Sequence, residues 1–166
     1  MKTTILVGNP KPRSRTLGTA TAVASYLGAA EDALVIDLAD YAPRLFDWSD
    51  AELADLNAQV AASDLLIVAS PTYKATYTGM LKAFLDRYDT DGLHGVVAVP
   101  VMTGGGDLHA LSIETYLRPL LVELGATVPA RGLYMTMARM ANQDQVVEEW
   151  GATAGPLIKA AVSARA

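Results

Sequence analysis

The sequence predicts an α/β fold in which helices cover both faces of one parallel β-sheet. Short apolar runs recur along the chain, and segments with helical character separate them. The runs are continuous in Val, Ile and Leu and do not alternate with polar residues, which is typical of strands buried on both faces. Because 51% of the 166 residues are hydrophobic, the chain can form a complete core. We therefore expect one domain over residues 1–166.

Five apolar runs mark the expected strands. In chain order they are residues 3–8, 33–39, 64–70, 95–102 and 131–137, of which the last is the least regular. The strand order 2-1-3-4-5 fits a chain of this length, because a six-stranded dinucleotide-binding sheet normally needs more residues. The prediction is a flavodoxin-like three-layer sandwich with a five-stranded parallel sheet. Ligands in such folds bind beyond the carboxyl ends of the strands where the order reverses, here between the first and third strands.

The segments between the strands carry helix signals. Gly28 is placed to end the first helix as its C′ residue, and Ser49 with Glu52 has the spacing of a capping box for the second. The fourth helix, expected over about residues 107–124, contains Pro119. Proline removes a backbone donor and collides with the preceding turn, so we expect a kink or a widened turn there.

Charge and composition narrow the classes of function. The 18 Asp and Glu residues outnumber the 13 Lys and Arg residues, the net charge is −5, and no basic tract could neutralise a polynucleotide backbone. The chain has no Cys, so neither disulfides nor thiolate metal sites can form, and redox chemistry would need a bound cofactor. No run has the length of a signal peptide or a membrane span. We expect a cytoplasmic protein that binds neither nucleic acid nor membrane and has no metal site.

The stretch GNPKPRSRT, residues 8–16, directly follows the first expected strand and suits a phosphate group. It is neither a P-loop, which would need Gly and Lys where Arg13 and Ser14 stand, nor a GxGxxG fingerprint, which would need Gly at Pro10. With the free N–H groups of the following helix, its polar side chains favour a terminal monophosphate over a pyrophosphate. These side chains belong to Asn9, Lys11, Arg13, Ser14, Arg15 and Thr16. The alternative is that the basic residues are solvated and a hydroxyl merely caps the helix.

Two further loops at the same edge of the sheet suit a flat ring. In SPTYKATYTGMLKAFLDRY, residues 70–88, Pro71 ends the third strand and leaves a rigid turn with exposed amides and an aromatic rim at Tyr73. Gly79 then opens a helix whose apolar stripe predicts core or subunit contacts. In TGGGD, residues 103–107, three glycines let the backbone approach a ligand and donate to a ring carbonyl that becomes electron-rich on reduction. The alternative for the glycines is a flexible turn.

These motifs, together with GGGDLHALSIETYLRPLLVELGA from residue 104 onward, resemble the NAD(P)H-dependent FMN reductases of the flavodoxin-like superfamily, particularly the flavin reductases that serve two-component monooxygenases. The resemblance runs from the N-terminus to about residue 137. It implies FMN as cofactor, with NADPH or NADH as co-substrate. It also implies a homodimer or homotetramer with Tyr77 near a subunit boundary, and a flavin-dependent monooxygenase as a candidate partner.

The residues that the resemblance assigns to FMN form two groups. Those near the phosphate are Asn9, Lys11, Ser14, Arg15 and Thr16, and those near the isoalloxazine ring are Pro71, Thr72, Tyr73, Lys74, Thr103, Gly104, Gly105 and Gly106. The family commonly has Ser where this chain has Asn9, which still supplies a donor. No catalytic residue is assigned, because hydride transfer from a nicotinamide to flavin N5 needs stacked rings and no acid, base or nucleophile.

Other functions fit the same motifs. FMN could be a released product for a monooxygenase, or a bound group that passes electrons to a quinone, an azo compound or a metal ion. A flavodoxin-type electron carrier without nicotinamide activity is disfavoured. Such carriers typically have a strongly acidic surface and a Ser/Thr-rich phosphate loop, whereas this chain is only mildly acidic and its loop is basic. A flavin-free binding domain on the same fold is the last alternative, since fold alone does not give function.

Overall fold

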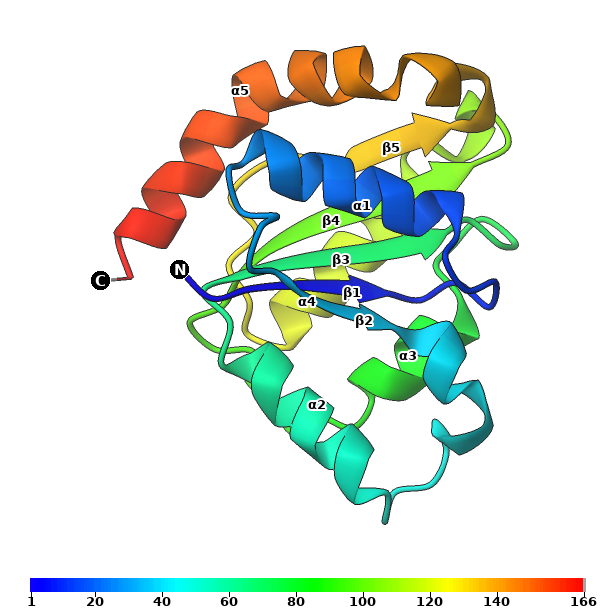
Figure 1. The fold of residues 1–166 in the computed structure, drawn as a ribbon, viewed down its shortest axis with the longest axis vertical. Coiled ribbons are helices and arrows are strands. Elements are labelled where there is room, and N and C mark those ends of the chain that lie inside the picture. Colours follow the sequence, from blue (N-terminus) through cyan, green and yellow to red (C-terminus); the bar gives the residue numbers. More distant parts are fainter. Residues whose placement is uncertain (166) are drawn as a thin grey trace.

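One parallel sheet organises the chain (Figure 1). The computed structural model describes residues 1–165, and its five strands lie in the order β2-β1-β3-β4-β5 with every neighbouring pair parallel. The strands are β1 (Thr3–Val7), β2 (Leu34–Asp37), β3 (Leu65–Pro71), β4 (Val97–Gly104) and β5 (Leu133–Thr136). The predicted flavodoxin-like fold and strand order are confirmed. β2 and β5 are shorter than the predicted runs, whereas β3 and β4 extend further toward the carboxyl edge.

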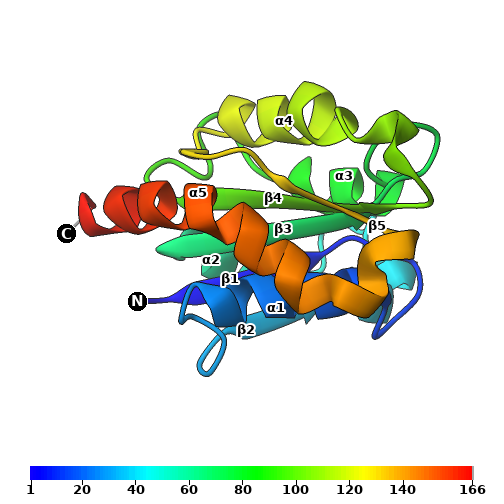
Figure 2. The same ribbon diagram turned by 90° about the horizontal axis from the view of Figure 1, so that it is seen from above.

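Helices form a layer on each face of the sheet (Figures 1 and 2). One layer consists of α1 (Arg15–Tyr26) and α5 (Gln143–Ser163), and the other of α2 (Ala51–Ala61), α3 (Gly79–Leu85) and α4 (Arg118–Glu123). Four short helical segments lie in the connections: η1 (Leu38–Arg44), η2 (Asp107–His109), η3 (Ile113–Leu117) and η4 (Met137–Asn142). In both views the carboxyl ends of the strands meet at one edge of the molecule.

The strands bury side chains on both faces, which explains their continuous apolar sequences. Ile5 and Val7 belong to the cluster under α1 and α5, and Leu6 between them belongs to the cluster under α2, α3 and α4. β3 follows the same alternation with Leu65 and Leu66, which are both almost fully buried. The two clusters hold the helical layers against the sheet and fix the loops at its edge.

The helix signals of the sequence have mixed outcomes. Gly28 has φ +71° just after α1, so it ends that helix as predicted. The capping box at Ser49 is wrong, because Asp50 is the N-cap of α2 and its Oδ1 accepts from the Leu53 N–H at 2.9 Å. Ser49 instead donates to the Asp47 carboxylate.

Pro119 interrupts the fourth helical segment in the expected way. It stands in the first turn of α4, where a missing N–H is tolerated, and the widened π-turn η3 directly precedes it. The continuous helix over residues 107–124 is therefore replaced by η2, η3 and α4. Within residues 1–165, no helix has both the length and the apolar character that crossing a bilayer requires.

Candidate functional site

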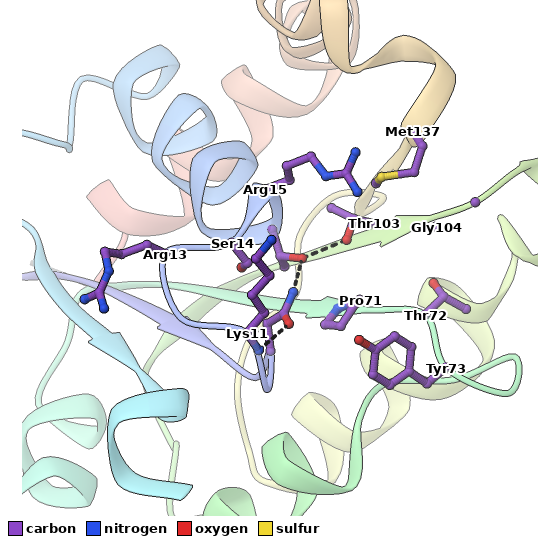
Figure 3. Close-up of a pocket in the computed structure, with 13 residues that line it drawn as sticks. Lys11, Arg13, Ser14, Arg15, Pro71, Thr72, Tyr73, Thr103, Gly104 and Met137 are labelled. Atoms are coloured by element: carbon purple, nitrogen blue, oxygen red, sulfur yellow. Dashed lines mark hydrogen bonds between the residues drawn. The ribbon is translucent and has the colours of Figure 1, made fainter.

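A cavity of about 350 Å³ opens at the carboxyl edge of the sheet, where the strand order reverses (Figure 3). Its walls come from the loop after β1, the ends of β3 and β4, and the first residue after β5. The lining residues are Asn9, Lys11, Arg13, Ser14, Arg15, Thr16, Pro71, Thr72, Tyr73, Thr103, Gly104, Gly105 and Met137. Its volume lies within the usual range for small-molecule sites.

The loop after β1 is shaped by its own side chains. Asn9 Oδ1 accepts from the Lys11 N–H at 2.9 Å and turns the chain just after the strand. Arg13 has φ +50°, a left-handed conformation that costs a non-glycine residue about 1–2 kcal/mol. The Asp37 carboxylate at the end of β2 accepts from the Arg13 N–H at 2.8 Å and holds this conformation. The loop is therefore anchored to the neighbouring strand.

The N-terminus of α1 carries positive potential. Ser14 is the N-cap, and its Oγ accepts from the Leu17 N–H at 3.3 Å. The first turn of this 12-residue helix has no acidic residue, so nothing on the helix offsets its positive dipole end. Figure 3 shows the Arg15 side chain extending toward Met137, while Arg13 points away from Pro71 and Tyr73. This end of the cavity suits an anion.

A chain of three buried side chains joins this loop to the end of β4. Asn9 Nδ2 donates to Thr16 Oγ1 at 2.9 Å, and Thr16 Oγ1 lies 2.8 Å from Thr103 Oγ1. The two hydroxyls carry two protons, and their mutual hydrogen bond uses one. One hydroxyl proton therefore remains for an acceptor in the cavity. Asn9 Oδ1 accepts from the Lys11 N–H and shapes the loop, while the second proton of its Nδ2 group remains for an acceptor.

The loop after β3 is anchored at its far end by Thr78. Its Oγ1 donates to the Gly8 carbonyl at 2.6 Å, and its N–H donates to Ser70 Oγ at 3.0 Å. Gly8 also packs closely on α3, since a Cβ at Gly8 would lie 2.4 Å from the Leu81 Cβ. These contacts fix the start of α3 against β1 and place Pro71 at the cavity wall.

A tight turn forms the tip of the same loop. Tyr73 and Thr76 exchange backbone hydrogen bonds of 2.9 and 3.2 Å, and Lys74 and Ala75 between them have φ +52° and +68°. Two positive φ values give the geometry of a type I′ hairpin turn. Tyr73 is 51% exposed, and its hydroxyl points toward the interior of the cavity in Figure 3. Lys74 is exposed at the tip and does not line the cavity.

The glycines after β4 form the opposite wall. Thr103, Gly104 and Gly105 line the cavity, and the Thr103 carbonyl accepts from the Thr72 N–H at 2.7 Å. Gly106 lies beyond the lining residues. This wall presents backbone and hydroxyl groups where a large side chain would fill the space.

Comparison with known proteins identifies the family. The model of the family described as NADPH-dependent FMN reductase matches residues 1–139. The chain belongs to this family. The FMN reductase (NADPH) of Pseudomonas aeruginosa is 34% identical over 142 residues, which cover 81% of this chain and 76% of that protein. The NADH-dependent FMN reductase SfnF of Pseudomonas putida is 40% identical over 102 residues, 60% of this chain and 54% of that protein.

A solved structure extends the similarity to the whole fold. The apo form of the NADH:FMN oxidoreductase EMOB superposes with a TM-score of 0.83 at 29% identity, covering 98% of this chain and 89% of that one. The match to SfnF, in contrast, spans only about half of that relative's length. The family match over residues 1–139 and the structural match over 98% of the chain therefore both cover most of this chain.

The structure brings most of the predicted site residues together in one cavity. Of the predicted residues, only Lys74 and Gly106 do not line it. Met137 also lines the cavity but was not predicted as a site residue; it is the last residue of the fifth expected run, and its place at the carboxyl end of that run was the available signal. Within residues 1–165, no three side chains of His, Cys, Asp or Glu gather closely enough to hold a metal ion.

Proposed function

We propose that the chain is an NAD(P)H-dependent FMN reductase and that the cavity at the carboxyl edge of the sheet holds FMN. The observation that carries the proposal is the division of the cavity into a cationic end at α1 and a backbone-lined end at β3 and β4. FMN has the same division, with a phosphate at one end and a planar ring at the other. The residues present therefore fit the group.

At the cationic end, the donors suit a phosphate monoester. Ser14 and the free N–H groups of α1 can donate, and Thr16 with Thr103 has one unused hydroxyl proton. Lys11 and Arg15 supply positive charge at the rim. Asn9 holds the loop in shape, as its hydrogen bonds to the backbone of Lys11 and to Thr16 indicate.

At the other end, the walls suit a flat ring. Pro71, Thr72 and Tyr73 offer a rigid turn on one side, and Thr103 to Gly105 offer open backbone on the other. When bound, FMN supplies the chemistry by accepting a hydride from NADPH or NADH at N5. The chain's own residues orient the ring, limit the access of water and place backbone dipoles near it. We assign no acid, base or nucleophile.

The electron acceptor and the assembly are further parts of the proposal. Reduced flavin could be released to a flavin-dependent monooxygenase, and a bound flavin that reduces a quinone, an azo compound or a metal ion is the second candidate. A homodimer or homotetramer is supported by exposed apolar side chains beside the glycine loop, with Leu108 96% and Leu111 65% exposed. We propose a cytoplasmic location and no binding to nucleic acid or membrane.

One assay tests the proposal. Purified protein is mixed with NADPH or NADH and with either catalytic or excess FMN, and oxidation of the nicotinamide is followed. Turnover that rises with free FMN supports a reductase that uses flavin as substrate. Turnover that needs a quinone or an azo dye supports the bound-flavin alternative, and no turnover under any condition contradicts both.

A further inference from the structure

We propose that Tyr134 is a positioning residue that ties together the two loops flanking the flavin ring, an inference that rests on the proposed function of the cavity. Tyr134 lies in the edge strand β5 and pairs in register with Met102 of β4. It is half-buried and is not among the residues that line the cavity. Its effect on a ligand would therefore pass through its neighbours.

The Tyr134 hydroxyl bridges the two loops. It donates to the Gly106 carbonyl at 3.2 Å and accepts from Thr72 Oγ1 at 3.5 Å. A tyrosine has a single hydroxyl proton, so these directions are mutually consistent. Among the side chains of residues 1–165, only that of Tyr134 hydrogen-bonds to the backbone of Gly104–Gly106.

The same hydroxyl explains the first glycine of the loop. A Cβ on Gly104 would lie 1.9 Å from the Tyr134 hydroxyl oxygen and 2.7 Å from its Cζ. No side chain can occupy that position while the phenol stays where it is. Gly105 and Gly106 would meet nothing within 4 Å. The glycine triplet therefore combines one position required by Tyr134 with two that face open space.

We call the two hydrogen bonds of the Tyr134 hydroxyl, to Gly106 and Thr72, the tether. The tether matters because the glycine loop, residues 104–106, has few other contacts that order it. Gly105 and Gly106 are exposed, and glycine loses more backbone entropy on ordering than any other residue. A hydroxyl bound to Gly106 on one side and to Thr72 on the other limits the relative motion of both walls. The hydrogen bonds of Tyr134 reach no residue of the phosphate loop, so its influence should be confined to the ring end.

Tyr134→Phe tests the tether while keeping the ring of the side chain. In the ligand-free protein, the amides of Gly105 and Gly106 should exchange faster and show lower NMR order parameters than in the wild type. The dissociation constants of FMN and of riboflavin, which lacks the phosphate, should rise by the same factor, about two- to tenfold. The visible absorption band of the bound flavin should also change. Tyr26→Phe, at the opposite end of α1 from the cavity, is the matched control and should change none of these.

A double-mutant cycle tests the steric part. Gly104→Ala should weaken flavin binding less in the Tyr134→Phe background than in the wild type, because the nearest clashing atom is gone. Additive effects would contradict the coupling. If Tyr134→Phe does not fold, Thr72→Val removes the other partner and should loosen the same loop.

The two levels of the proposal fail in different ways. Unchanged glycine amides and unchanged flavin affinity in Tyr134→Phe would overturn the tether alone. A wild-type protein that binds neither FMN nor riboflavin would overturn the proposed function. In that case faster exchange at Gly105 and Gly106 would still establish the tether, while its role toward a flavin would be wrong.

Discussion

Thr16 and Thr103 hydrogen-bond through their side-chain oxygens at 2.8 Å, although 87 positions separate them in the chain. Thr16 lies in the first turn of α1, and Thr103 lies at the end of β4. Both are almost fully buried, at 1% and 3% exposure. This contact joins the start of α1 to the end of β4 through two side chains that also line the cavity.

Replacing Thr103 with Val should weaken both stability and ligand binding. The substitution keeps the shape but leaves Thr16 without one partner, so the free energy of unfolding should fall by about 1 kcal/mol. FMN affinity should fall as well, because the Thr103 hydroxyl no longer lines the cavity and Thr16 loses the hydrogen bond that orients its own hydroxyl. Urea unfolding and fluorescence titration with FMN measure the two effects. Thr103→Ser keeps the hydroxyl and should retain the stability and the FMN affinity of the wild type. Thr127→Val, at an exposed position, should also leave both quantities unchanged.

Ser14→Asp should separate helix capping from anion binding. Asp is as good an N-cap as Ser and interacts well with the helix dipole, so stability should be kept or slightly raised. Its charge would oppose a phosphate by about 1–4 kcal/mol at a 4 Å separation, depending on the local dielectric. FMN affinity should therefore fall at least about fivefold, and riboflavin affinity should not change. Equal FMN affinity in Ser14→Asp and in the wild type would contradict the assigned phosphate loop.

Gly8→Ala should force β1 and α3 apart. The new Cβ would lie 2.4 Å from the Leu81 Cβ, inside the core, so we expect a loss of about 1–3 kcal/mol in the free energy of unfolding. Gly18→Ala in α1 is the matched control, because a Cβ there meets nothing within 4 Å. That variant should gain up to about 1 kcal/mol from helix propensity. Urea unfolding with losses of equal size in both variants would contradict the close contact.

Stability should decline at high pH through Tyr88. Burial raises the pKa of Tyr88, whose hydroxyl donates to the Asn57 carbonyl at 2.9 Å. Above the pKa of about 10 of an unfolded tyrosine, the unfolded chain loses this proton while the folded chain keeps it. Ionisation then favours unfolding. The stability that the protonated Tyr88 contributes at neutral pH is therefore lost as pH rises. The free energy of unfolding should fall less steeply between about pH 9 and pH 11 in Tyr88→Phe than in Tyr116→Phe, which changes an exposed tyrosine.

The sheet order and the position of the cavity could be predicted because they depend on patterns along the whole chain. Continuous apolar runs place both faces of each strand in a core, and the carboxyl ends of parallel strands share one edge. Met137, the last residue of the fifth expected run, belongs to that edge by the same rule, but the chemistry of an apolar side chain does not by itself indicate a ligand. Tyr134 was missed because its role depends on the closeness of two loops, which only the packed structure defines.

Local details depended on contacts that no single-sequence pattern contains. Ser49 and Asp50 are both good N-caps, and the choice of Asp50 agrees with its ion pair to Arg44 at 2.9 Å. Lys74 is adjacent to Tyr73 in sequence, yet the tight turn carries it away from the cavity wall. Such a turn is usually predicted from Asn or Gly, and this chain forms it with Lys and Ala.

The origin of the cavity walls links ligand binding to the assembly of the entire chain. The walls follow β1, β3, β4 and β5, so a nascent polypeptide that ends at residue 104 lacks Met137 and the strand before it. A nucleotide that needs all four segments will bind only after the last strand has docked. Binding then raises the free energy of global unfolding, by about 2.7 kcal/mol when the free nucleotide concentration is 100 times the dissociation constant. Cellular nucleotide supply would thereby help to set how long the protein survives heat and proteases.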